Sequence, residues 1–140
     1  MDATLILCDH AAAAEGKLYI NGAGWTTVLA QVPAPMGLAA LVRVDWTESN
    51  IKHLLVLQLV TEDGHPALNP EGQPWRAEGE VEVGRPPGVR HGTPTVVPLA
   101  LNFPAVPLLP ARYRWELLMD GQLLSSAEFD AVPGPPELKR

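Results

Sequence analysis

Hydrophobic and polar residues alternate along much of this chain, in short segments separated by turn residues. In residues 75–83, glutamate occupies every second position from 78 to 82, and mostly apolar residues fill the positions between. Residues 112–119 alternate in the same way, with Tyr113 and Trp115 on the apolar side. Because successive side chains of a strand point to opposite faces, this pattern predicts half-buried β-strands.

Turn signals divide these segments. Asp120-Gly121 predicts a two-residue hairpin turn after the strand at 112–119, and Asn21-Gly22 predicts another between residues 17–20 and 24–29. The run 54–60 is apolar at nearly every position, which favours a well-buried strand.

The first residues are ambiguous. Residues 3–14 contain a run of four alanines before Gly16, which is compatible with the end of a short helix. We favour a strand over residues 3–9, because the same turn-rich pattern continues directly after it.

Together these features predict an all-β protein with little or no helix. We expect an antiparallel β-sandwich of about eight or nine short strands, of the Greek-key, C2-like or immunoglobulin-like kind. Residues 1–132 are expected to form a single β-sandwich domain, followed by a flexible C-terminal tail at 133–140.

Composition narrows the function classes. The 140 residues carry ten Lys and Arg against sixteen Asp and Glu, so the net charge of −6 argues against nucleic acid as a partner. The lone cysteine, Cys8, is typical of a reducing compartment, and the first apolar run is too short for a signal core or a transmembrane segment. We therefore expect a cytoplasmic protein.

Few residues indicate chemistry. Cys8 and His10 share one side of the first strand, but nothing near them in sequence would activate a thiolate, so a buried structural thiol is expected. The acids Asp45, Asp63 and Asp120 fall near strand ends and could ligate Ca²⁺, yet they are dispersed. We predict no catalytic residue, no metal and no cofactor.

Candidate contact residues lie near turns. Trp46 and Trp115 are expected in the core, whereas Trp25 and Trp75 could be partly exposed interface anchors. The segment 84–94, rich in Pro and Gly, is a connector between strands in our interpretation, and Pro107–Arg112 matches a polyproline-ligand pattern only weakly. The possible interaction surface comprises Trp25, Trp75, Arg85 and Arg90.

Two long stretches, residues 5–25 and 84–121, resemble a bacterial family of small proteins known as a domain of unknown function, frequent in high-GC bacteria. The resemblance covers about residues 3–132, with one departure at Ala111, where a glycine would be expected. It implies a compact all-β domain and no site residues. The matching features are Gly16-Lys17-Leu18, Gly24-Trp25, Pro86-Pro87-Gly88, Pro98-Leu99, Asn102-Phe103 and Tyr113.

The sequence thus favours a non-enzymatic protein-interaction module that binds a protein partner or forms a homo-oligomer. The alternative is a sandwich that binds a ligand or, assisted by Ca²⁺, a membrane surface through its acidic end loops. An enzyme is the third hypothesis.

Overall fold

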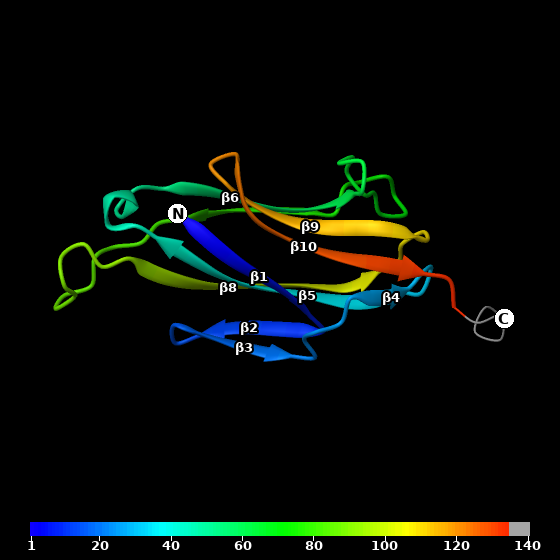
Figure 1. Cartoon of the computed structure of the whole chain (residues 1–140), viewed down its shortest axis with the longest axis horizontal. Coiled ribbons are helices and arrows are strands. Elements are labelled where there is room, and N and C mark those ends of the chain that lie inside the picture. The colour runs from blue at the N-terminus through cyan, green and yellow to red at the C-terminus, as the bar shows by residue number, and fades with distance from the viewer. Residues whose placement is uncertain (135–140) are drawn as a thin grey trace.

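The computed structural model describes residues 1–134 and is all-β, which confirms the predicted fold class (Figure 1). A single turn of 3₁₀ helix, η1 (Trp46–Glu48), is the helical segment of this range, and no helix in it is long and apolar enough to cross a membrane. The predicted tail at 133–140 lies mostly outside the described residues. The strands are β1 (Asp2–Cys8), β2 (His10–Ala14), β3 (Lys17–Asn21), β4 (Thr27–Leu29), β5 (Ala34–Val44), β6 (His53–Thr61), β7 (Arg76–Val81), β8 (Thr95–Val106), β9 (Ala111–Met119) and β10 (Gln122–Val132).

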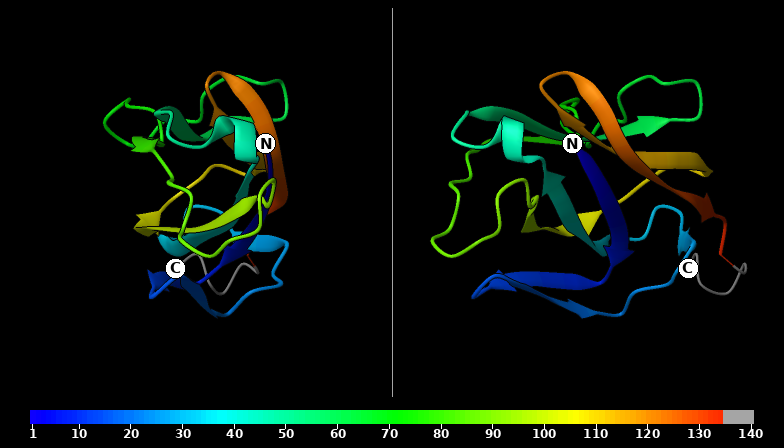
Figure 2. Two further views of the ribbon diagram at one scale, coloured as in Figure 1. Left: turned by 90° about the vertical axis from the view of Figure 1, so that its left-hand side faces the viewer. Right: turned by 60° about the vertical axis from the view of Figure 1, so that its left-hand side comes forward.

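The strands form three sheets rather than the two layers of eight or nine strands that we expected. A three-stranded sheet has the order β1-β5-β8, a five-stranded sheet has the order β4-β10-β9-β6-β7, and β2 and β3 form a separate hairpin. Pairing is antiparallel except between β10 and β4, which run parallel. The predicted sandwich therefore has to be amended to two facing sheets with an added hairpin (Figure 2).

The two larger sheets curl around a common core and meet along one side only. On the closed side, β1 of the first sheet contacts β10 of the second. On the open side, β7 and β8 are the last strands of their sheets and do not pair with each other, although they follow one another in the chain. The two sheets thus form a barrel that is closed on one side and open on the other, which we call the half barrel.

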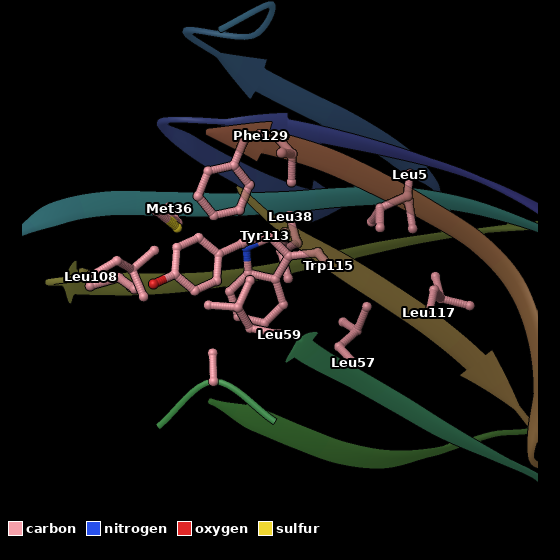
Figure 3. Close-up of a cluster of buried hydrophobic side chains, with 14 of the residues drawn as sticks. Leu5, Met36, Leu38, Leu57, Leu59, Leu108, Tyr113, Trp115, Leu117 and Phe129 are labelled. Carbon is pink, nitrogen blue, oxygen red and sulfur yellow. The ribbon is translucent and has the colours of Figure 1, made fainter. Parts of the chain in front are cut away.

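Aromatic side chains from β9 and β10 occupy the core (Figure 3), and the half-buried Phe103 of β8 packs against them. Trp115 is fully buried and stacks on Phe103, with ring centroids 5.0 Å apart, and Tyr113 stacks on Phe129 at 5.8 Å. The alternation of residues 112–119 therefore places its apolar positions inward, as predicted.

One hairpin turn was predicted correctly and one was not. Asp120-Gly121 joins β9 to β10, and both residues have positive φ (52° and 79°), as a type I′ turn requires. Asn21-Gly22 ends β3 instead of joining two strands, and its two carbonyls lie near the Asp9 N–H (3.0 and 3.2 Å). The hairpin turn of this region is Glu15-Gly16, with φ of 53° and 73°.

The N-terminal segment is extended, as we favoured, and it supplies two sheets. After β1, the chain folds back as the β2–β3 hairpin over the outer face of the three-stranded sheet, where Ala11 packs with Cys8 and Ala39. The Asn102 side chain fixes the hairpin, because it accepts a bond from the Ala11 N–H (2.9 Å) and donates one to the Ala11 carbonyl (2.8 Å).

Candidate functional site

An apolar groove lies at one end of the half barrel, and we call it the mouth groove. Its walls are formed by Gln31, Thr61, residues 66–70, residues 107–109 and Tyr113, and its volume is about 490 Å³. The loop between β6 and β7, which supplies part of this lining, lies at the end of the molecule away from η1 (Figure 1). No charged residue lines the groove.

Hydrogen bonds hold one wall of the mouth groove in place. The Tyr113 hydroxyl donates to the Leu109 carbonyl (2.8 Å), and burial raises the pKa of this phenol, so it stays protonated. The Gln31 N–H donates to the Leu108 carbonyl (2.7 Å), and Gln31 itself has a positive φ of 63°. This wall is therefore preformed.

The opposite wall, in the loop between β6 and β7, is also ordered by its own bonds. The Ala67 N–H donates to the Leu59 carbonyl (2.9 Å), and the Asn69 side chain accepts the N–H groups of Glu71 (3.0 Å) and Gln73 (2.8 Å). Asn side chains commonly stabilise turns in this way.

Two large leucines line the groove and remain exposed to solvent. Leu68 is 55% exposed and Leu109 is 67% exposed, although both belong to otherwise ordered segments. Such leucines beside an apolar concavity are a feature of binding surfaces.

A second, smaller hollow of about 130 Å³, which we call the side slot, opens on the open side between the two sheets. Leu55 and Leu57 of β6, Ala77 and Gly79 of β7, and Leu99 and Leu101 of β8 contribute to its lining. The slot exists because β7 offers only small inward residues there: a Cβ built on Gly79 would meet no atom within 4 Å.

The two tryptophans predicted as contact anchors are half-buried and pack on the core. Trp25 meets Phe129 edge-on with ring centroids 5.7 Å apart, and Trp75 meets Phe103 edge-on at 5.8 Å. The indole N–H of each is buried with no hydrogen-bond partner among the described residues. These rings serve packing in the chain as described.

The two arginines lie in the segment between β7 and β8. The Arg85 guanidinium lies over the Trp46 ring, 4.2 Å from its centroid, and donates to the Ser49 hydroxyl (2.8 Å) and to the Trp46 carbonyl (2.7 Å). Arg90 is exposed. Within residues 1–134, no hydrogen bond, ion pair or ring contact joins any two of the four predicted residues Trp25, Trp75, Arg85 and Arg90.

These contacts explain the segment 84–94 and correct the placement of Trp46. The segment connects the two sheets, as predicted, and fastens to η1 through Arg85 and through His91, whose ring lies 4.6 Å from Trp46. Trp46 is half-buried beneath this segment instead of lying in the core, because the strand ends at Val44.

The other candidates are dispersed. Cys8 is fully buried, and burial raises the pKa of its thiol, which favours the unreactive protonated form, while His10 is exposed. Asp45 pairs with the N-terminal ammonium group (3.3 Å) and Asp120 with His53, so these acids do not share one site. Over residues 1–134 no three His, Cys, Asp or Glu residues gather closely enough to hold a metal ion.

Sequence reasoning missed His53, a buried histidine with two polar partners. Its Nδ1 lies 2.7 Å from Asp120 Oδ2 and its Nε2 lies 2.8 Å from the Glu48 carbonyl oxygen. These acceptors, the Glu48 carbonyl first, raise the pKa of His53, because only the imidazolium can donate to both. No local pattern marks this residue, since both partners come from other segments.

Comparisons with known proteins describe the chain further. Residues 3–132 match the Family of unknown function (DUF6941), and no curated protein matches the chain. Among solved structures, the chain is similar to Pseudomonas fluorescens alkylpurine DNA glycosylase AlkC bound to DNA containing an abasic site analog. That similarity has a TM-score of 0.41 and 11% identity, and it covers 76% of this chain but 28% of the glycosylase chain.

Proposed function

The chain belongs to the Family of unknown function (DUF6941), and we propose that it acts as a protein-binding module that docks its partner in the mouth groove. The observation that supports this proposal is the pairing of a preformed apolar groove with two exposed leucines, Leu68 and Leu109, in its lining.

The chemistry of the lining defines the partner. Its polar contributions come from Gln31, Thr61, Asn69 and Tyr113, and the Tyr113 hydroxyl is already bonded to Leu109. With no charged group to recognise, the groove suits an extended apolar segment of another protein. The same lining supplies no acid, thiol or histidine for catalysis, which favours binding without chemistry.

The rigidity of the groove also favours binding. Both walls are ordered by hydrogen bonds within the chain, so docking would cost little conformational entropy on this side. A partner side chain that covered Leu68 and Leu109 would remove apolar surface from water, which is the main driving term of association.

Site-specific photo-crosslinking in the native cell tests this proposal. A photoreactive amino acid at position 109 should capture a defined partner that the same amino acid at the control position 123 does not. Leu123 is a suitable control because it is also an exposed leucine (50%), but it lies after the β9–β10 turn, away from the groove.

The partner identified by mass spectrometry would then be purified and its affinity measured. Leu109→Asp should weaken binding about 10- to 100-fold, as expected for losing one buried leucine contact, and Leu123→Asp should leave it unchanged. Equal crosslinking from both positions would contradict the proposal. If position 109 crosslinks only to a second copy of this chain, sedimentation would show a dimer and the partner would be the protein itself.

A further inference from the structure

The open side carries two neighbouring strand edges without partners. β7 ends the five-stranded sheet and β8 ends the three-stranded sheet, and within residues 1–134 no strand pairs with either edge. The segment 84–94 joins them at one end, and at the other end Trp75 meets Phe103 of β8. Such edges are templates for pairing with an added strand.

Between these edges the side slot has room for one apolar side chain. Its volume of about 130 Å³ is close to that of engineered protein cavities, about 150 Å³, that hold a benzene-sized ligand. Leu99 and Leu101 point toward it from β8 and remain half-exposed, since Ala77 and Gly79 of β7 are too small to cover them. The slot is therefore an unfilled place in the core that can be reached from the open side.

The outer face of β7 is acidic, in contrast to the apolar side slot on its inner face. Glu78, Glu80 and Glu82 are exposed at alternate positions, and Arg76 pairs with Glu78. Neither Glu80 nor Glu82 has a basic partner in the part of the chain that is described, and β8 contains no charged residue. The row therefore keeps its negative charge at the free edge.

We propose that the open side binds an extended segment in which apolar and basic residues alternate, and that this segment pairs with the edge of β7. Side chains of an added strand alternate between the same two faces as those of β7. Residues beside Ala77 and Gly79 would enter the side slot, and residues beside Glu80 and Glu82 would form ion pairs if they are lysine or arginine. The expected partner segment therefore has apolar and basic residues at alternate positions.

Charge also argues for a partner other than a second copy of this chain. Two copies that met edge to edge at β7 would bring two rows of glutamate together, and like charges directly opposite each other destabilise a pair of strands. A basic segment meets no such repulsion.

Synthetic peptides test the proposal on the full chain. A fluorescent peptide of alternating lysine and valine should bind, whereas a peptide of alternating glutamate and valine, or of lysine and glycine, should not. Added salt should weaken the binding, because ionic strength screens exposed pairs. Hydrogen exchange of the complex should slow at the backbone amides of β7, which shows where the peptide lies.

Two variants alter the two faces separately. Glu80→Lys with Glu82→Lys removes the ion pairs, and Gly79→Leu fills the slot; each should weaken peptide binding at least about tenfold. The matched control, Asp63→Lys with Glu71→Lys, makes the same change of charge at exposed acids of the loop between β6 and β7 and should bind normally.

Unfolding curves of each variant establish that it is folded. Binding of the lysine–valine peptide no tighter than that of the control peptides, or binding that neither variant weakens, would overturn the proposal. Leu109→Asp should leave peptide binding unchanged, so the test is independent of the mouth groove.

Discussion

The closed and open sides of the half barrel differ although they flank the same strand. Leu38 of β5 pairs with Leu7 of β1 toward the closed side and with Leu101 of β8 toward the open side. Leu7 is 6% exposed, whereas Leu101 is half-buried beside the side slot. Identical side chains at equivalent positions thus experience different solvent exposure.

Leu7 and Leu101 differ in solvent exposure because a different strand of the five-stranded sheet faces each of them. On the closed side, β10 contacts β1 and contributes Phe129, which is 2% exposed. On the open side, β7 contributes Ala77 and Gly79, which leave the slot unfilled. The two sheets are thus held together from one side, while the other side keeps accessible apolar surface.

Truncating the two leucines tests this difference most strongly. Leu7→Ala should lower the free energy of unfolding by about 2–5 kcal/mol, the range for a buried leucine, because it leaves a cavity in a packed region. Leu101→Ala should cost about 1 kcal/mol, since part of that side chain is already in contact with water. Urea unfolding of both variants measures these values, and equal losses would mean that the two sides are equally packed.

A methyl group added at either of two glycines should have opposite effects on stability. Gly37→Ala should destabilise the fold by about 1–3 kcal/mol, because its Cβ would lie 2.8 Å from Cys8 Sγ and 3.0 Å from Asn102 Oδ1 beneath the β2–β3 hairpin. Gly79→Ala should stabilise the fold by about 0.5–1 kcal/mol, because the slot has space and glycine is unfavourable within a strand. Thermal unfolding of the pair decides the matter, and a loss of stability at Gly79→Ala would show that the slot is filled.

The smallest expected effect on stability comes from the pair of His53 in β6 and Asp120 in the β9–β10 turn. Because the pKa of His53 is raised from 6.5, its contribution is fully present below 6.5 and is lost as pH rises through the folded-state value. Because the pKa of Asp120 is lowered from 3.8, chiefly by His53, its contribution is lost as pH falls through its folded-state value. The pair therefore stabilises the protein most between pH 3.8 and 6.5.

Unfolding curves of Asp120→Asn and the wild-type chain, recorded across this range, test the effect. The difference between them should be largest within the window and should shrink toward alkaline pH. A constant difference would show that His53 does not change its charge over the range measured. The effect should be modest, since the Asp120 side chain is 52% exposed.

Much of the local structure follows from the sequence pattern. The alternation in residues 75–83 and 112–119 identified β7 and β9, and Asp120-Gly121 identified the hairpin turn between β9 and β10. Asn21-Gly22 misled us because a turn dipeptide shows only that the chain bends, and the actual turn at Glu15-Gly16 follows an alanine-rich strand with little alternation.

The candidate sites were less accessible to sequence reasoning. Trp25 and Trp75 stood out as large residues near turns, but Phe129 and Phe103 engage them from distant strands. The mouth groove joins residues near positions 31, 68 and 109, and nothing in the spacing of these residues predicts that they meet.

The period of two, the strands within residues 75–83 and 112–119, the Asp120-Gly121 turn and the acidic outer face of β7 follow from the sequence alone, because each depends on residues that are neighbours along the chain. The closure of one side by β10, and the separation of β7 from β8 on the other, emerge only when the chain is folded. That outcome depends on which strands pair across long sequence separations and on how side chains of different size fill the space between two sheets, and both are properties of the packed chain.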